Sequence, residues 1–281
     1  MRLATVVTPE GETFGAVTDR GLLDLRARLG GRYPDLKALL AAGPADVPEP
    51  VEIDYALADL TWRPVVPNPS KIICVGLNYR DHRAETGNRE SAHPALFLRT
   101  PDSQVGHGQP LLRPGESATL DYEGEVAVVV GRAGRRIPRS RAWQHIGGIS
   151  CYNDGSVREY QRHTAQYTAG KNFPRTGGFG PWLTTIDEFG SAPLLTLSCR
   201  VNGTTVQAAR TDDMIFPIDE IVEYASTVFA LEPGDVIVTG TPGGVGSRRE
   251  PPVYLQAGDV VEVEIDGVGV LRNPVADETP G

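Results

Sequence analysis

Residues 120–130 read Leu120-Asp121-Tyr122-Glu123-Gly124-Glu125-Val126-Ala127-Val128-Val129-Val130, an acidic start followed by an apolar run. Successive side chains of a β-strand point to opposite faces, so Glu123 and Glu125 share one face. The opposite face carries Tyr122, Val126, Val128 and Val130. Neighbouring carboxylates at the start of a buried strand are costly to desolvate unless a cation neutralises them. The segment therefore indicates either a cation site or the solvated acidic face of an edge strand.

A third carboxylate follows a second apolar run and stands just before a predicted helix over residues 155–166. Asp154 is suited to cap that helix. Arg158 and Gln161 follow at i+4 and i+7 on the same helical face, which favours a lined pocket over a cap alone. Three carboxylates without a cysteine ligand suit a hard divalent cation, Mg²⁺ or Mn²⁺, better than structural zinc.

Residues 75–87 contain a candidate acid–base pair. If the chain turns helical after Gly76, His82 and Glu85 at i,i+3 share a face, and the carboxylate raises the basicity of the imidazole. Such a pair can act as a general base that activates water. An ordinary ion pair on a surface helix is the alternative.

Two loops that contain glycine add candidate contacts to an anion. Lys171 lies in the turn Thr168-Ala169-Gly170-Lys171-Asn172-Phe173. The loop Thr239-Gly240-Thr241-Pro242-Gly243-Gly244-Val245-Gly246 follows an apolar strand and can present backbone N–H groups. It lacks the Lys-Ser or Lys-Thr pair of a phosphate loop, and a tight turn between strands is the alternative.

The composition excludes several classes of protein. The chain has 281 residues, with 32 Gly, 23 Pro and 40% hydrophobic residues, which argues against a helix bundle and against a disordered chain. The formal charge of −9 argues against nucleic-acid binding. No apolar run reaches ~18 residues and the N-terminus lacks a signal-peptide pattern, so we expect neither a membrane span nor secretion. The cysteines form no zinc or redox pattern, and we expect a cytoplasmic protein.

We expect a mixed β (α+β) fold in two units. Residues 1–70 form a small N-terminal α/β unit with a hairpin over residues 3–17, a helix over residues 33–42 and an extended, Pro-rich connector over residues 43–70. Residues 71–281 form the main unit, in which short β-branched runs alternate with glycines and further helices cover residues 155–166 and 217–229.

In this order the motifs resemble the fumarylacetoacetate hydrolase superfamily, in its branch of bacterial acylpyruvases and 2-hydroxyhepta-2,4-diene-1,7-dioate isomerases. The resemblance covers about residues 71–275. It is carried by Gly76-Leu77-Asn78-Tyr79 with His82 and Glu85, Asp121-Tyr122-Glu123-Gly124-Glu125, Asn153-Asp154 with Arg158 and Gln161, Gly170-Lys171, Asp213-Met214-Ile215-Phe216, Leu231-Glu232-Pro233-Gly234-Asp235 and Thr239-Gly240-Thr241-Pro242.

The resemblance implies a β-sandwich roll that forms a homodimer and binds one Mg²⁺ or Mn²⁺ per subunit. It makes residues 71–281 the catalytic domain and implies a small 2-oxo carboxylate as substrate. The residues it assigns are Glu123, Glu125 and Asp154 as metal ligands, His82, Glu85 and Lys171 as catalytic groups, and Tyr79, Arg158, Gln161, Gly240 and Thr241 as substrate contacts.

Two departures from the family pattern lie where the side chain of the substrate would pass. Arg99 stands where the family often has lysine, and the two side chains differ in geometry and hydration. Arg175 lies in a run, residues 172–181, that lacks the family's Asp-Thr pair. The roles of Arg99 and Arg175 therefore stay open, including whether either faces the open end of the pocket, and so does the identity of the substrate.

The implied reaction is hydrolytic C–C cleavage of a 2,4-dioxo carboxylate, of the acylpyruvate or fumarylpyruvate type, to pyruvate and an acid. The alternative is decarboxylation of oxaloacetate, or tautomerisation and decarboxylation of a 2-hydroxymuconate-type diacid, through the same enolate. The His82–Glu85 pair favours hydrolysis, because it can activate water. A non-catalytic protein with a structural cation is the third hypothesis, and the additional lysine, arginine and His–Glu pair argue against it.

Overall fold

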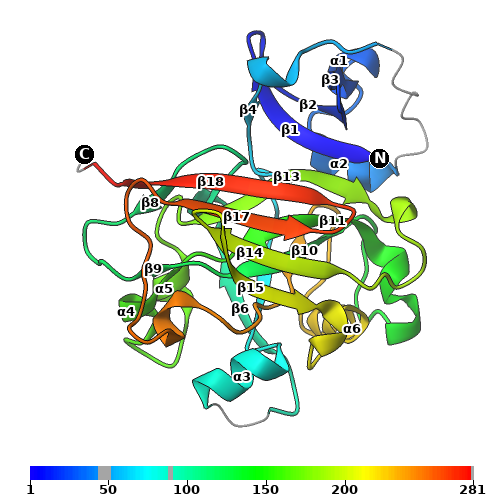
Figure 1. Ribbon diagram of the computed structural model, residues 1–281. Helices are drawn as coiled ribbons and strands as arrows, with labels where there is room; N and C mark the ends of the chain where they lie inside the picture. Colours follow the sequence, from blue (N-terminus) through cyan, green and yellow to red (C-terminus); the bar gives the residue numbers. More distant parts are fainter. Residues whose placement is uncertain (44–51, 88–90, 280–281) are drawn as a thin grey trace.

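The computed structural model describes residues 1–43, 52–87 and 91–279, and within them two large β-sheets pack face to face (Figure 1). The larger sheet contains β1 (Arg2–Thr8), β2 (Gly11–Thr18), β3 (Gly21–Asp24), β4 (Thr61–Trp62), β5 (Ile72–Gly76), β6 (Ala95–Arg99), β7 (Gln104–Val105), β10 (Gly124–Val130), β11 (Ile146–Asn153), β13 (Gly177–Thr185) and β16 (Val236–Val238). The smaller sheet contains β8 (Leu111–Arg113), β14 (Thr196–Val201), β15 (Thr204–Arg210), β17 (Val260–Ile265) and β18 (Gly269–Asp277). A two-stranded ladder joins β9 (Leu120–Asp121) to β12 (Ser156–Val157).

Short helices fill the remaining connections. They are α1 (Leu25–Arg28), α2 (Leu36–Ala42), α3 (Arg80–Thr86), α4 (Arg158–Gln161), α5 (Thr168–Lys171) and α6 (Ile218–Val228). Within the described residues, none of them combines the length and the apolarity that crossing a membrane requires. The sheet-dominated α+β architecture is the fold class that the sequence predicts.

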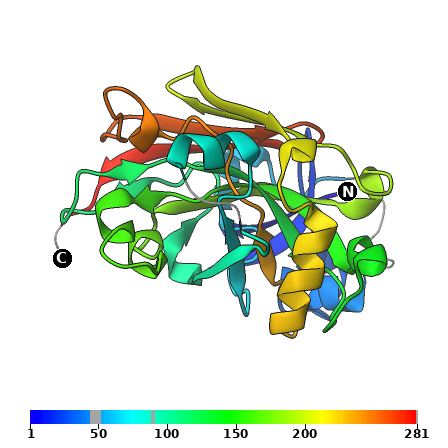
Figure 2. The same ribbon diagram turned by 90° about the horizontal axis from the view of Figure 1, so that it is seen from below.

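The path of the larger sheet is β3-β2-β1-β13-β11-β10-β16-β5-β6. The smaller sheet, with the red β18 in Figure 1, covers the face of β10, β11 and β13, and the view in Figure 2 shows this layering from below. The strands of the N-terminal hairpin continue the larger sheet, because Leu3 of β1 pairs with Leu183 of β13. The division into units 1–70 and 71–281 stays a prediction.

Strand β10 separates two apolar cores. Val126 and Val128 belong to the core between the two sheets. Ala127 and Val129 belong to the core on the opposite face, which α2 covers. The alternation predicted for residues 122–130 is therefore confirmed, and it places Glu125 on the same face as Ala127 and Val129.

Local sequence signals account for the predicted hairpin and for two of the three predicted helices. Strands β1 and β2 form the hairpin, with Leu3 paired to Ala16 and Thr8 to Gly11. The carboxylate of Asp35 caps α2 by accepting from the backbone N–H of Ala38. Pro217 precedes α6. Pro44, Pro48 and Pro50 of the predicted connector lie outside the described residues, and its described part contains β4 and a 3₁₀ turn at Leu57–Asp59.

The predicted helix over residues 155–166 is wrong. Residues 156–157 form β12, and α4 occupies only 158–161, with Val157 rather than Asp154 at its cap position. Long-range pairing outweighs the local pattern, because Ser156 pairs with Asp121 of β9. Gly155 also fits tightly against the next segment, since a Cβ there would lie 1.9 Å from the carbonyl oxygen of Thr176.

Asn78 ties the end of β5 to two other segments, and its loss is expected to destabilise the fold. Its Nδ2 donates to the carbonyl oxygens of Phe216 (3.0 Å) and Thr239 (2.7 Å), and its Oδ1 accepts from the N–H of Phe216 (2.9 Å). Each buried polar group left unpaired costs about 1–3 kcal/mol, so we expect Asn78→Ala to lower the free energy of unfolding by about 3 kcal/mol in a urea titration. The exposed Asn68→Ala is the control, and an equal loss in both variants would contradict this role.

Candidate active site

Four strand ends converge on one cavity of about 200 Å³. Strands β10 and β11 are antiparallel and Gly124 pairs with Asn153, so Glu123, just before β10, and Glu125, at its start, lie beside Asp154, just after β11. The end of β16 lies beside the start of β10 and leads into the loop at Gly240. The end of β5 leads into α3. The cavity is lined by Val75, Gly76, Leu77, His82, Thr86, Phe97, Glu123, Glu125, Asp154, Arg158, Gln161, Arg162, Tyr167, Lys171, Thr241, Val245, Ser247 and Arg248.

The three carboxylates predicted as metal ligands form a buried cluster. Glu123, Glu125 and Asp154 each offer an oxygen, and these oxygens lie within 4.8 Å of one another. The backbone fixes their spacing, because the N–H of Asp154 donates to the carbonyl oxygen of Glu123 at 2.8 Å. At most 5% of each residue is exposed to solvent, so water screens their mutual repulsion poorly.

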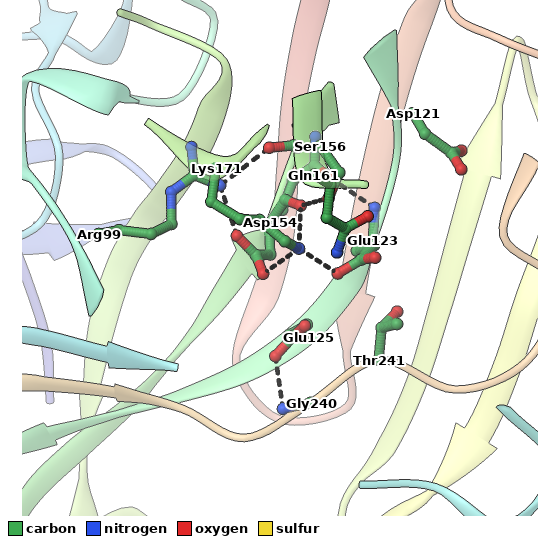
Figure 3. Close-up of polar contacts among 12 residues, drawn as sticks. Arg99, Asp121, Glu123, Glu125, Asp154, Ser156, Gln161, Lys171, Gly240 and Thr241 are labelled. Carbon is green, nitrogen blue, oxygen red and sulfur yellow. Dashed lines mark hydrogen bonds and ion pairs between the residues drawn. The ribbon is translucent and has the colours of Figure 1, made fainter. Parts of the chain in front are cut away.

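Basic side chains neutralise part of this cluster. The Lys171 ammonium donates to Glu123 Oε2 at 2.7 Å and to Asp154 Oδ2 at 2.6 Å, as Figure 3 shows. Arg158 pairs with Glu123 Oε1 at 2.6 Å, and its Nε donates to Asp121 Oδ2 at 2.8 Å. Within the described residues, Glu125 has no ion pair, and its Oε2 accepts from the N–H of Gly240 at 2.5 Å.

These contacts separate the acidities of the carboxylates. Burial opposes ionisation of Glu123, but Lys171 and Arg158 outweigh it and lower its pKa to about 2. Burial, together with the charges of Asp154 and Glu123, raises the pKa of Glu125 well above its usual range. Burial likewise disfavours the charged form of Lys171, but Asp154 and Glu123 outweigh it and raise the pKa of the lysine. Lys171 is therefore a cation at neutral pH rather than a base.

The donor set fits a hard divalent cation. It consists of carboxylate oxygens, which Mg²⁺ and Mn²⁺ prefer, and Glu125 lacks a basic partner among the described residues. With every carboxylate ionised, the four buried acids Asp121, Glu123, Glu125 and Asp154 exceed the three buried bases Arg99, Arg158 and Lys171 by one charge. A divalent cation would reverse that sign and make the cavity attractive to an anion, although the whole chain carries a formal charge of −9.

Helix α3 brings the predicted acid–base pair to the cavity. His82 Nδ1 and Glu85 Oε1 lie 2.7 Å apart, and His82 lines the cavity with 6% of its surface exposed. Burial raises the pKa of Glu85, but the hydrogen bond with His82 and that from the N–H of Gly244 (3.1 Å) outweigh it and lower the pKa. Because Glu85 engages Nδ1, Nε2 is the ring nitrogen left to exchange a proton with a substrate.

The loop after β16 presents a backbone N–H group to an anion, as its sequence predicts, and the anion is the carboxylate of Glu125. Gly240 is required there, because its φ is +107° and a Cβ would lie 2.6 Å from Cβ of Asn78. Thr241 lines the cavity, donates to the carbonyl oxygen of Gly124 at 3.0 Å and accepts from Gln207 Nε2 at 2.8 Å.

The structure places the residues predicted to contact the substrate differently with respect to the cavity. Tyr79 does not line the cavity: it is fully buried in the core between the sheets. Gly240 does not line the cavity either and contacts Glu125 instead. Neither Arg99 nor Arg175 lines the cavity. Arg99 is 97% buried behind Asp154, and Arg175 lies in the turn before β13, where its N–H donates to the carbonyl oxygen of Asp102. Arg158 and Gln161 do line the cavity, joined by a hydrogen bond of 2.9 Å.

Sequence reasoning missed other residues around the cavity. Asp121 is fully buried and accepts from the N–H groups of Gly246 and Ser247 as well as from Arg158, so it anchors the cavity wall. Its place in the motif beside Glu123 was a signal for such a role. Gln207 on β15 carries no motif, and only the packing of β15 reveals its contact with Thr241. Two exposed arginines, Arg162 and Arg248, also line the cavity.

The comparisons with known proteins agree on one family. Residues 71–276 match the family described as fumarylacetoacetate (FAA) hydrolase C-terminal. The chain is 39% identical over 226 residues to the oxaloacetate tautomerase YisK of Bacillus subtilis (strain 168), covering 79% of this chain and 75% of that protein.

Solved structures resemble the whole chain. The 5-carboxymethyl-2-hydroxymuconate delta-isomerase of Mycobacterium smegmatis aligns with a TM-score of 0.80 and 30% identity, covering 100% of both chains. The maleylpyruvate hydrolase of Sphingobium sp. SYK-6, solved with manganese(II) and pyruvate, aligns with a TM-score of 0.82 and 28% identity, covering 99% of this chain and 100% of that one. The chain therefore belongs to the fumarylacetoacetate hydrolase family of enzymes, in its isomerase-like branch.

Proposed function

We propose that this enzyme interconverts the enol and keto forms of a small 2-oxo dicarboxylate of the oxaloacetate type. The observation that carries the proposal is the single cavity in which three carboxylates and Lys171 meet the His82–Glu85 pair. The relatedness to an oxaloacetate tautomerase supports it. A cavity of about 200 Å³ is smaller than the ~300–1,000 Å³ of drug-sized ligand sites, which suits a small acid.

Tautomerisation moves protons without changing the atoms of the substrate: one proton leaves C3 of the keto form and one arrives at the 2-oxygen. A divalent cation held by Glu123, Glu125 and Asp154, which we propose to be Mg²⁺ or Mn²⁺, would act as a Lewis acid toward the 2-oxo oxygen. His82 Nε2 accepts the proton from C3, Glu85 stabilises the imidazolium that results, and the imidazolium then gives a proton to the 2-oxygen, which restores neutral His82.

Arg158 and Lys171 hold the substrate as an anion. Arg158 Nη2 is buried and has no hydrogen-bond partner within the described residues, so a substrate carboxylate would satisfy it. The Lys171 ammonium is a permanent donor that compensates negative charge on the substrate oxygens as the enolate forms.

The second candidate is hydrolytic C–C cleavage of a 2,4-dioxo carboxylate. It uses the same residues, except that His82 takes a proton from water instead of C3. The similarity in fold to the maleylpyruvate hydrolase favours it. Decarboxylation of the same kind of diacid is a third outcome, since it needs the cation and no base.

One assay separates these reactions. The full-length protein with Mg²⁺ is mixed with the enol form of oxaloacetate, and the enol absorbance, free pyruvate and CO₂ are followed together. We expect the enol to decay faster than in buffer without release of pyruvate or CO₂, and EDTA to abolish the acceleration. In a parallel assay with acetylpyruvate, release of pyruvate and acetate at a comparable rate would show that the enzyme is a hydrolase rather than a tautomerase.

The proposed location of the enzyme rests on its thiols. All three cysteines are buried and unpaired, which suits a reducing compartment, and we propose the cytoplasm. We also propose a homodimer, which sedimentation of the full-length chain would test.

A further inference from the structure

Arg99, at the end of β6, is bound to one of the three carboxylates from outside the cavity. It is 3% exposed and does not line the cavity wall. Its Nη1 donates to Asp154 Oδ1 and to the carbonyl oxygen of Gly155 at 3.0 Å. Its Nε donates to Ser103 Oγ at 3.2 Å, and its Nη2 donates to Thr176 Oγ1 at 3.1 Å. Every nitrogen of the guanidinium is engaged, so its plane is fixed.

This contact orients the Asp154 carboxylate. Oδ1 is held on the Arg99 side, while Oδ2 lies on the cavity side, 2.6 Å from the Lys171 ammonium. A carboxylate oxygen has two lone-pair sites, so Oδ2 can accept from Lys171 and still coordinate an ion. With Oδ1 retained by Arg99, the geometry favours coordination by one oxygen.

In the other two carboxylates of the cluster, too, one oxygen is held by a neighbouring group. Glu123 has Oε1 held by Arg158 at 2.6 Å, and Glu125 has Oε2 held by the N–H of Gly240 at 2.5 Å. One oxygen of every carboxylate in the cluster is thus held by Arg99, Arg158 or the Gly240 N–H. The second oxygens of Asp154 and Glu123 both accept from Lys171, at 2.6 and 2.7 Å, and each keeps a lone-pair site for an ion. Three carboxylates that each offer one oxygen suit the compact octahedral shell of Mg²⁺, whereas Ca²⁺ takes 6–8 oxygens and accepts bidentate carboxylates.

We propose that Arg99 is a positioning residue that holds Asp154 as a monodentate ligand and so selects Mg²⁺ or Mn²⁺ over Ca²⁺. The proposal rests on the proposed metal site and not on the reaction catalysed there. If Arg99 acted through its charge alone, its removal would strengthen the binding of Mg²⁺ and Ca²⁺ alike, because a nearby cation repels every divalent ion. A role in folding alone would leave the ratio of the two affinities unchanged.

The test is calorimetric titration of the EDTA-treated, full-length protein with Mg²⁺ and, separately, with Ca²⁺. Arg99→Lys keeps the charge but loses the planar fork, and Arg99→Met removes both. Loss of a group that orients a metal ligand typically costs ~10–100-fold in affinity, so we expect Arg99→Lys to weaken Mg²⁺ binding by that factor, with little change for Ca²⁺. We expect Arg99→Met to lower the Mg²⁺/Ca²⁺ affinity ratio at least as much.

Two further variants keep the test decisive if Arg99→Met does not fold. Thr176→Val removes the nearer of the two acceptors of Nη2, the other being the carbonyl oxygen of Ser103 at 3.5 Å, while the charge stays, and we expect a smaller fall of the ratio in the same direction. Arg200→Met is the control, because Arg200 pairs with Glu262 and Glu264 on the smaller sheet, and there the ratio should not change. A wild-type ratio in Arg99→Lys and Thr176→Val would overturn the proposal and leave the proposed function standing. Wild-type protein that binds no divalent cation would overturn both the metal site and this inference.

Discussion

Replacement of Glu125 by glutamine is expected to abolish binding of the divalent cation and to lower kcat/KM on the order of 10³-fold or more. Glu125 is the carboxylate of the cluster that has no ion pair within the described residues, so its charge is the one that the cation must compensate. Lewis-acid activation by a metal is worth several kcal/mol of transition-state stabilisation, and each 1.36 kcal/mol is tenfold in rate. Glutamine keeps the shape and the acceptor for the N–H of Gly240, so the fold should persist.

The measurements are calorimetric titration with Mg²⁺ and the enol decay rate at saturating Mg²⁺. Glu159→Gln is the matched control: this glutamate is exposed on α4 and accepts from Ser117 Oγ at 2.9 Å. We expect the control to bind Mg²⁺ and to react as the wild type does. Wild-type Mg²⁺ affinity in Glu125→Gln would show that the cation is held elsewhere.

Replacement of His82 by alanine is expected to lower kcat by ~10²–10⁴, the usual worth of a positioned general base, while Mg²⁺ affinity stays unchanged. The reason is that His82 lines the cavity but pairs with Glu85 rather than with any of the three carboxylates. The combination of lost turnover and preserved metal binding separates this variant from Glu125→Gln.

The comparison variants are Glu85→Gln and His145→Ala. Glu85→Gln leaves the imidazole in place and removes the charge that stabilises its protonated form, so we expect a smaller loss of kcat than in His82→Ala. His145 is half-buried and does not line the cavity, and its Nδ1 lies 3.0 Å from the carbonyl oxygen of Arg132, so its loss should leave kcat unchanged. Full kcat in His82→Ala would remove the acid–base pair from the mechanism.

The sequence predicts those parts of the site that depend on local periodicity. Alternation along residues 122–130 places Glu123 and Glu125 together, and helical spacing pairs His82 with Glu85. Both patterns extend over a few residues of one element, so no tertiary information is needed. The joining of Asp154 to the glutamates was an inference from motif order, and the register of β10 against β11 supplies its physical cause.

The parts that the sequence does not reveal depend on contacts between distant segments. Arg99 reaches Asp154 across 55 positions, and no local pattern distinguishes an arginine behind a carboxylate from one at a pocket mouth. The predicted helix over residues 155–166 was wrong for the same reason, since the pairing of β12 with β9 overrides helical periodicity. Tyr79 lies beside the motif residue Asn78 but is buried in the core, which composition alone does not show.

Incorporation of solvent deuterium at C3 of oxaloacetate, followed by proton NMR in D₂O, tests the proposed reaction most directly. The experiment compares the Mg²⁺-loaded full-length protein with the EDTA-treated protein and with Glu125→Gln. We predict that only the loaded wild type accelerates exchange at C3 and that the total oxaloacetate falls no faster than in buffer. Exchange at the buffer rate in all three samples, or loss of oxaloacetate to pyruvate in step with any exchange, would contradict a tautomerase.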